Sequence, residues 1–253
     1  MTCRSPQEIS ADERISSCTA ALQSKNYSSF YANLAYGKRA EAYLEKGDFD
    51  AAILDITQVM KLYPSNLSVY SLRALAYLQK GDFERAIADY ARVTDDPKSP
   101  PFFRYYRARG IAYLTAGSLP EALRDLNRSI ELNPKDSRTA LWLEVVARRS
   151  RLPSRLAETE AQLDMTKWPA PVVRLFLGNV TREQVLMAAD DGDAKGRDSR
   201  ICQANFFGGE LAMQRGTREE AVRLLRLAAA DCPNNLAERA AAKAELNAFG
   251  ANL

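Results

Sequence analysis

The sequence predicts an all-α protein built as a solenoid of helical hairpins. Two observations favour this fold class: an eight-residue segment occurs in three similar copies along the chain, and apolar residues accompany each copy at helical spacing. A third observation points away from an enzyme. The 253 residues include no histidine, which removes the commonest general base and the commonest metal ligand. We therefore expect a protein of stacked helices that catalyses no reaction itself, with no cofactor and no metal.

The recurring segment sets the period of the array. Residues 42–49 carry Ala-Tyr-Leu-Glu-Lys-Gly-Asp-Phe, residues 76–83 carry Ala-Tyr-Leu-Gln-Lys-Gly-Asp-Phe, and residues 112–119 carry Ala-Tyr-Leu-Thr-Ala-Gly-Ser-Leu. A looser copy, Leu-Ala-Met-Gln-Arg-Gly-Thr, occupies residues 211–217. The glycines of the first three copies lie 34 and then 36 residues apart, a spacing typical of helix-turn-helix repeats.

Each copy predicts a helix, a turn and a second helix. The glycine can take the left-handed conformation that closes the first helix, and the polar residue after it can cap the second. The predicted capping residues are Asp48, Asp82, Ser118 and Thr217. Capping boxes are expected for Ser118 with Glu121, for Thr217 with Glu220 and for Thr181 with Gln184.

Aromatic and small residues alternate on the inner faces of these helices. Tyr36, Ala40 and Tyr43 share one face in the first repeat, and equivalent triplets follow in the next two. The tyrosines could form a ligand cage, but packing between repeats is the better interpretation. A small residue, a Tyr, an Ala and a Pro at these spacings resemble the tetratricopeptide repeat (TPR) family. The final copy keeps Gly209, Ala221, Ala228 and Pro233, with Ala212 where Tyr is usual.

The TPR resemblance implies a right-handed superhelix with a concave face that binds peptides or proteins. Repeats of this kind bury their cores only by stacking, so the array needs capping helices, expected at residues 7–24 and 235–249. We divide the chain into an N-terminal arm and cap (1–31), three repeats (32–134), a divergent helical segment (135–200), and a final repeat with its cap (201–253).

The divergent segment predicts a helix around Trp142, another over 153–164, a short apolar helix after the Pro169–Pro171 pair, and a polar loop at 190–199. This order, followed by a last repeat that contains Asn205-Phe206-Phe207-Gly208, resembles the NlpI-type family of bacterial envelope adaptors. That resemblance implies an exported, dimeric scaffold that brings peptidoglycan hydrolases and a processing protease together.

The TPR resemblance also locates a partner-binding groove at positions 2, 5, 9 and 12 of each first helix. The candidate residues are Leu34, Glu41, Leu44, Ser68, Ser71, Leu75, Leu78, Arg104, Arg107, Ile111, Leu114 and Arg138. Arg104 and Arg107, three residues apart on one helix face, could grip a carboxylate together. Partners are therefore expected to carry acidic or carboxylate-bearing segments. A solvated basic face without a partner is the equally strong alternative.

Four cysteines occur as two pairs, one near each end of the chain. Cys202 and Cys232 mark the outer ends of the last helical hairpin, which antiparallel packing brings together, so a disulfide is expected. Cys3 is expected to pair with Cys18, with lipidation of Cys3 as the alternative; we expect any other lipid anchor to lie upstream of Met1. Paired cysteines favour an oxidising compartment, here the bacterial periplasm or envelope.

Other functions find less support. The net charge of +3 gives no argument for nucleic acid, and no apolar run is long enough to cross a bilayer. TPR co-chaperones that clamp partner C-termini carry Lys and Asn where this chain has Gly37 and Glu41, so that clamp is excluded. Direct binding of peptidoglycan or another envelope polymer, or a cytosolic adaptor role, remain the alternatives to the envelope scaffold.

Overall fold

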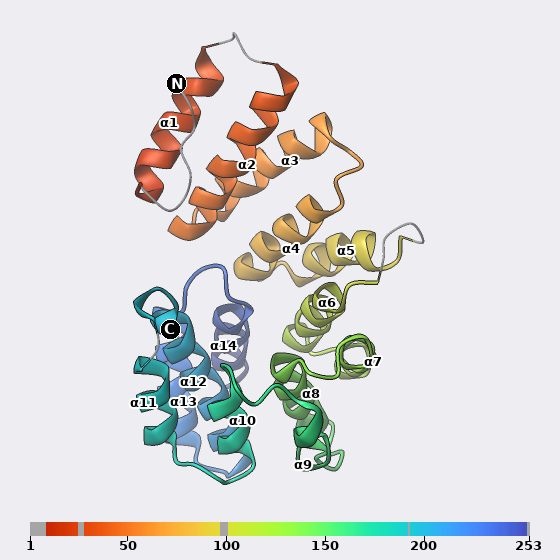
Figure 1. Ribbon diagram of the computed structural model, residues 1–253, viewed down its shortest axis with the longest axis vertical. Coiled ribbons are helices and arrows are strands. Elements are labelled where there is room, and N and C mark those ends of the chain that lie inside the picture. Colours follow the sequence, from red (N-terminus) through yellow and green to blue (C-terminus); the bar gives the residue numbers. More distant parts are fainter. Residues whose placement is uncertain (1–8, 25–27, 97–100, 192, 252–253) are drawn as a thin grey trace. The chain divides into compact units, whose positions relative to one another are not determined.

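The computed structural model describes residues 9–24, 28–96, 101–191 and 193–251, and in those residues every regular element is a helix (Figure 1). The chain forms two compact units, Met1–Asp96 (unit 1) and Pro97–Leu253 (unit 2). The boundary falls inside the block expected to hold three repeats. No helix in the described part of the chain has the length and apolar character needed to span a membrane.

Unit 1 contains a capping helix and two helical hairpins. Helix α1 (Ala11–Gln23) packs on α2 (Ser29–Lys46), which forms the first hairpin with α3 (Phe49–Leu62). The second hairpin consists of α4 (Ser68–Lys80) and α5 (Phe83–Thr94). Gly47 and Gly81 each close a first helix at a φ of 79°, as their spacing predicts. The predicted caps are confirmed at Asp48 and Asp82, whose carboxylates accept bonds from Ala51 N at 3.1 Å and Arg85 N at 3.2 Å.

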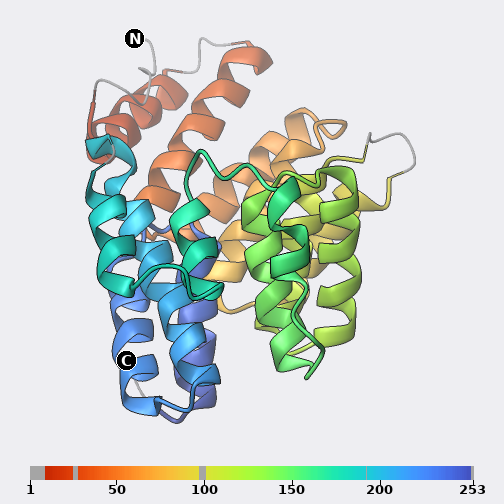
Figure 2. The same cartoon turned by 60° about the horizontal axis from the view of Figure 1, so that its bottom comes forward.

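Unit 2 begins with α6 (Phe103–Thr115), α7 (Leu119–Leu132) and α8 (Ser137–Arg149). Four short elements follow: α9 (Leu156–Thr159), the 3₁₀ turn η1 (Glu160–Gln162), α10 (Ala170–Phe176) and α11 (Arg182–Asp190). The unit ends with α12 (Ala194–Gln214), α13 (Arg218–Asp231) and α14 (Ala237–Ala248), which run side by side in Figure 2. Helix α14 also contacts α6, so the last helix of unit 2 returns to its first.

Three expectations from the sequence are wrong. The stretch 153–164 is not one helix, because the chain leaves helical geometry to bury Leu163 and to donate the Asp164 N–H to the Lys135 carbonyl at 3.1 Å. Most of 190–199 is helix, since Asp193 caps α12 through the N–H of Gly196 at 2.9 Å.

The capping boxes at Ser118 and Thr217 are the third error, because neither side chain caps its helix. The Thr217 hydroxyl donates instead to the Ala212 carbonyl, and Glu220 pairs with Arg223. The capping box of Thr181 with Gln184 is confirmed.

A repeated ion pair joins the two helices of each of the first three hairpins. Arginine and aspartate sixteen residues apart form two hydrogen bonds of 2.6–3.1 Å, as Arg39–Asp55, Arg73–Asp89 and Arg109–Asp125. The guanidinium groups lie 5.6–5.9 Å from the ring centroids of tyrosines on the first helix of each hairpin. The tyrosines therefore pack against an internal ion pair, which agrees with their predicted packing role.

The last hairpin, α12 with α13, lacks this ion pair. Gly208 and Leu224 occupy the two positions, and a Cβ on Gly208 would lie 3.3 Å from the Leu224 side chain. A disulfide joins Cys202 to Cys232 with a Cα–Cα distance of 4.9 Å, which confirms that predicted pair. Cys18 is buried in α1, whereas Cys3 lies outside the described residues.

A buried charge cluster connects α8, α12 and α14. Arg149 donates to Glu210 and to Glu245, each at 2.6 Å. Glu210 is 1% exposed, and burial raises its pKa to about 7 although Arg149 opposes the shift. Two carboxylates share one guanidinium in the interior of unit 2, so its stability should depend on pH.

Candidate functional site

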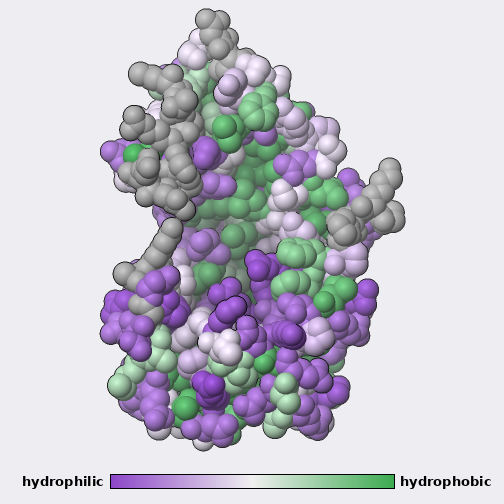
Figure 3. All heavy atoms as spheres, viewed as in Figure 1, coloured by the Kyte–Doolittle hydropathy of each residue, from purple (hydrophilic) through white to green (hydrophobic). Residues whose placement is uncertain are grey.

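A cleft of about 660 Å³ in unit 2 brings predicted binding residues together. Its walls come from the first turns of α6, the turn before α8 with the start of that helix, and the segment 161–169. Five lining side chains are cationic: Arg104, Arg107, Lys135, Arg138 and Lys167. Figure 3 shows hydrophilic side chains gathered on the face of unit 2 that it views. We call this site the basic cleft.

The two arginines of α6 differ in how available they are. Arg107 is ion-paired with Asp136, whose carboxylate also caps α8 by accepting from Thr139 N at 3.2 Å. Burial lowers the pKa of Arg107, and the charge of Asp136 acts against that shift. Arg104 is exposed, has no ion pair among the residues described, and lies 5.6 Å from the ring centroid of Phe103. The charge of Arg107 is therefore already paired with a carboxylate, and Arg104 is the arginine that an anion could reach.

The remaining cations lie on the other two walls. Lys135 and Arg138 are exposed and form no ion pair within the described part of unit 2. Lys167 Nζ lies 3.8 Å from the carboxylate of Asp164, and its side chain is 81% exposed, so this pair is weak. Bonds from the hydroxyl and N–H of Thr166 lower the pKa of Asp164 and keep it charged. Arg104, Lys135 and Arg138 thus present positive charge that no ion pair among the described residues neutralises.

Hydrogen bonds hold the third wall in place. Besides the bond from Asp164 N to the Lys135 carbonyl, Ser137 Oγ donates to the Asp164 carbonyl at 3.1 Å. The indole N–H of Trp168 donates to Gln203 at 2.6 Å, and the Gln203 amide donates to the buried Glu238 at 2.9 Å. The segment 161–169 is therefore tied to both α8 and the interior of unit 2.

Glu238 on α14 is the buried carboxylate beneath the cleft. Burial raises its pKa, and the nearby charges of Arg138 and Arg107 act in the opposite direction. Even when Glu238 is ionised, it joins only Asp136 and Asp164 against five cations. The cleft therefore keeps an excess of positive charge and is suited to bind an anion, with arginines that can form paired hydrogen bonds to a carboxylate.

Comparison with known proteins agrees with the repeat architecture. The model of a tetratricopeptide repeat family matches residues 38–100 and 74–137. Residues 38–137 therefore contain TPR repeats. A crystal structure of a tetratricopeptide repeat protein from Parabacteroides merdae ATCC 43184 has the same fold, with a TM-score of 0.56 and 15% identity over 94% of this chain and 93% of that one.

Two other solved structures are less similar. YrrB, described as a TPR protein with an unusual peptide-binding site, is 14% identical over 92% of this chain and 97% of that one, with a TM-score of 0.45. MamA is 17% identical over 88% and 97%, with a TM-score of 0.43. At these levels of similarity, neither structure informs the binding site of this protein.

The TPR groove positions divide between the two units. In unit 1, Leu34, Glu41 and Ser68 are exposed, Ser71 and Leu75 are half-buried, and Leu44 and Leu78 are interior, at 3% and 1% exposure. In unit 2, Arg104 and Arg138 reach the basic cleft beside the paired Arg107, whereas Ile111 and Leu114 lie in the core. The four interior side chains therefore offer little surface to a partner.

Sequence reasoning missed part of the cleft. Lys135, next to the helix-ending Pro134, and Lys167 were not among the expected binding residues, and the wall 161–169 was assigned in part to a helix. The turn position of Lys135 is visible in the TPR pattern and could have suggested it. Nothing local marks Lys167, because its place depends on bonds between segments distant along the chain.

Proposed function

We propose that this protein is a non-catalytic scaffold that binds acidic segments of partner proteins in the basic cleft. The observation that carries the proposal is the convergence of Arg104, Lys135 and Arg138, exposed and without ion pairs in the described residues, on one cleft. An extended peptide with Asp or Glu side chains, or a C-terminal carboxylate, would neutralise these charges. The ring of Phe103 beside them would supply an apolar contact.

We also propose that the protein works in the bacterial envelope. The buried Cys202–Cys232 disulfide supports this location, because disulfides form and persist in oxidising compartments. The order of segments around Trp142, Trp168 and Phe206, which resembles NlpI-type adaptors, supports it as well. Peptidoglycan hydrolases or a processing protease are the partners that this resemblance suggests.

A charge-reversal experiment tests the cleft. Arg104→Glu with Arg138→Glu changes two exposed lining residues, and Arg124→Glu with Arg128→Glu makes the same charge change on α7 outside the cleft. Each protein is crosslinked in an envelope extract, and captured partners are identified by mass spectrometry. We expect the cleft variant to lose the partners that wild type and control retain, and wild-type capture to weaken with salt. Equal capture by both variants would contradict the proposal.

Two further measurements separate the alternatives. Sedimentation with purified sacculi tests direct polymer binding, which should be absent if the cleft acts on proteins. Rapid alkylation of thiols in intact cells tests the compartment, because a cytosolic adaptor would have Cys202 and Cys232 reduced. Sacculus binding that the cleft variant abolishes would favour the polymer-binding function instead.

A further inference from the structure

The repeat pattern breaks after α8, and the break leaves a space. In the three hairpins before it, the second helix has 12–14 residues. After α8, Arg151 takes a φ of 55°, the chain has no regular structure over 152–155, and α9 contains only four residues. A short irregular segment therefore lies where the repeat would place a full second helix.

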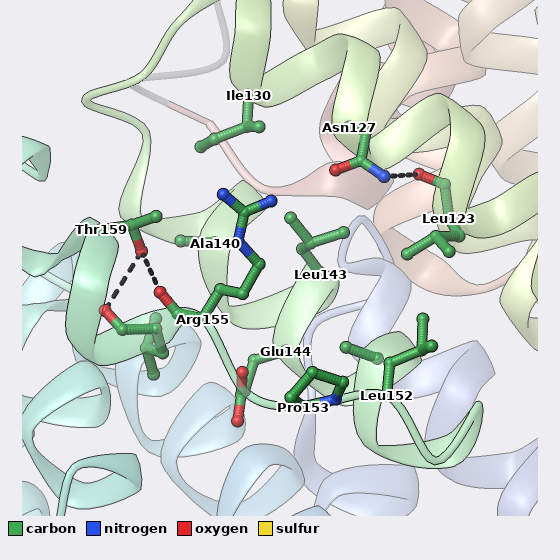
Figure 4. Close-up of a pocket in the computed structure, with 12 residues that line it drawn as sticks. Leu123, Asn127, Ile130, Ala140, Leu143, Glu144, Leu152, Pro153, Arg155 and Thr159 are labelled. Carbon is green, nitrogen blue, oxygen red and sulfur yellow. Dashed lines mark hydrogen bonds between the residues drawn. The ribbon is translucent and has the colours of Figure 1, made fainter.

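A cavity of about 360 Å³ lies between α7, α8 and residues 152–159 (Figure 4). Its walls are mainly aliphatic and include Leu123, Ile130, Leu143, Leu152 and Leu156. This volume is within the range of about 300–1,000 Å³ that small-molecule sites occupy. None of its lining residues belongs to the basic cleft, so the two sites are separate.

Most polar groups of the cavity are already satisfied. Glu144 is ion-paired with Arg148 and accepts a bond from Ser154 Oγ at 2.9 Å. The Thr159 hydroxyl is within 3.1 Å of the carbonyls of Arg155 and Leu156, to which it can donate. These groups therefore need no hydrogen bond from a ligand.

Arg155 is the exception. In Figure 4 its guanidinium points toward the side of the cavity where Ile130, Leu143 and Thr159 lie. Its ion-pair partner is Glu158, at 3.6 Å, and both side chains are more than 70% exposed, so solvent screens this pair strongly. An aliphatic cavity thus has one available cation at its opening.

We propose that this cavity binds a small amphipathic anion, a carboxylic acid whose apolar body fills the aliphatic space and whose carboxylate pairs with Arg155. Burial of the apolar body would drive binding, and the paired hydrogen bonds between guanidinium and carboxylate would orient it. A medium-chain fatty acid has this chemistry. The inference does not depend on the basic cleft or on the proposed scaffold function.

The test uses delipidated full-length protein and three ligands with the same ten-carbon chain: decanoate, decanol and decylamine. Isothermal titration calorimetry should show one binding site for decanoate. Decanol should bind with at least about tenfold lower affinity, because it loses one charge-assisted contact, and decylamine should bind more weakly still. No decanoate binding, or equal binding of decanoate and decylamine, would overturn the proposal.

Two variants and a control locate the site. Arg155→Gln should weaken decanoate about tenfold and leave decanol unchanged, whereas Arg124→Gln, an exposed arginine of α7 outside the cavity, should change neither. Leu143→Trp should fill the cavity and abolish binding of both ligands, with circular dichroism checking that the variant remains folded. Binding of decanoate that survives both Arg155→Gln and Leu143→Trp would place the ligand elsewhere and refute the assignment.

Discussion

Removal of the Cys202–Cys232 disulfide should lower the stability of unit 2 by an amount that depends on the length of the loop that the disulfide closes. The two cysteines are separated by 30 residues, and both are 2% exposed. In the chain-entropy model, a crosslink that closes a loop of this length stabilises the folded state by about 3.7 kcal/mol at 25 °C. We therefore expect Cys202→Ala with Cys232→Ala to lower the free energy of unfolding of unit 2 by about 3–4 kcal/mol.

The positions of the tryptophans allow this effect to be measured in one unit. The two tryptophans of the chain, Trp142 and Trp168, both belong to unit 2, so their fluorescence reports the unfolding of that unit alone. With a urea m-value of about 2 kcal/mol/M, the unfolding midpoint should fall by roughly 2 M. Reductant should lower the wild-type midpoint to the same value and leave the variant unchanged.

A fall of less than about 0.5 M would refute the reasoning, because it would show that α12 and α13 hold their ends together in the unfolded ensemble without the crosslink. A midpoint of the variant that still responds to reductant would contradict it in another way, since another disulfide would then stabilise unit 2.

Three other predictions test the interior by urea unfolding. Gly110→Ala should destabilise unit 2 by about 1–3 kcal/mol, because its Cβ would lie 2.9 Å from a leucine side chain, whereas Gly37→Ala, with open space around its Cβ, should stabilise unit 1 by up to ~1 kcal/mol. Asp125→Ala should cost about 3 kcal/mol, since it removes the carboxylate that binds the buried Arg109. The raised pKa of Glu210 means that its protonated form stabilises the fold; this contribution is complete below pH 4.5 and lost as pH rises through about 7. The free energy of unfolding of the wild type should therefore fall by roughly 2–3 kcal/mol between pH 4.5 and 8, and Glu210→Gln should remove most of this fall. An unchanged pH profile in the variant would exclude Glu210 as the source.

The local and repeated features of the fold could be predicted from the sequence. The turns at Gly47 and Gly81, the packing role of the tyrosines and the Cys202–Cys232 pair each depend on residues within one hairpin, where spacing alone fixes geometry. The Arg39–Asp55 pair and its two counterparts also recur at a constant spacing of sixteen residues, so the same signal was available for them.

The candidate sites depended on the tertiary structure. Arg104 and Arg138 were expected to bind a partner. They line a cleft only because the segment 161–169 forms its third wall, and that segment is held by the bonds of Asp164 to Lys135 and of Trp168 to Gln203. The aliphatic cavity exists because 153–164 does not form the single helix that the sequence predicts, and only the four residues of α9 and a 3₁₀ turn are helical there.

Helix periodicity and turn residues determine which stretches pair locally, so this sequence by itself specified repeats, their turns and their inner faces. Contacts across a hundred or more residues, such as α14 against α6, depend on which buried surfaces fit together after the hairpins have formed. No local pattern encodes that choice, because the free energy that decides it comes from burial shared between distant segments. Only the tertiary structure therefore decided which cations meet, which of them are already paired, and where an unfilled cavity remains.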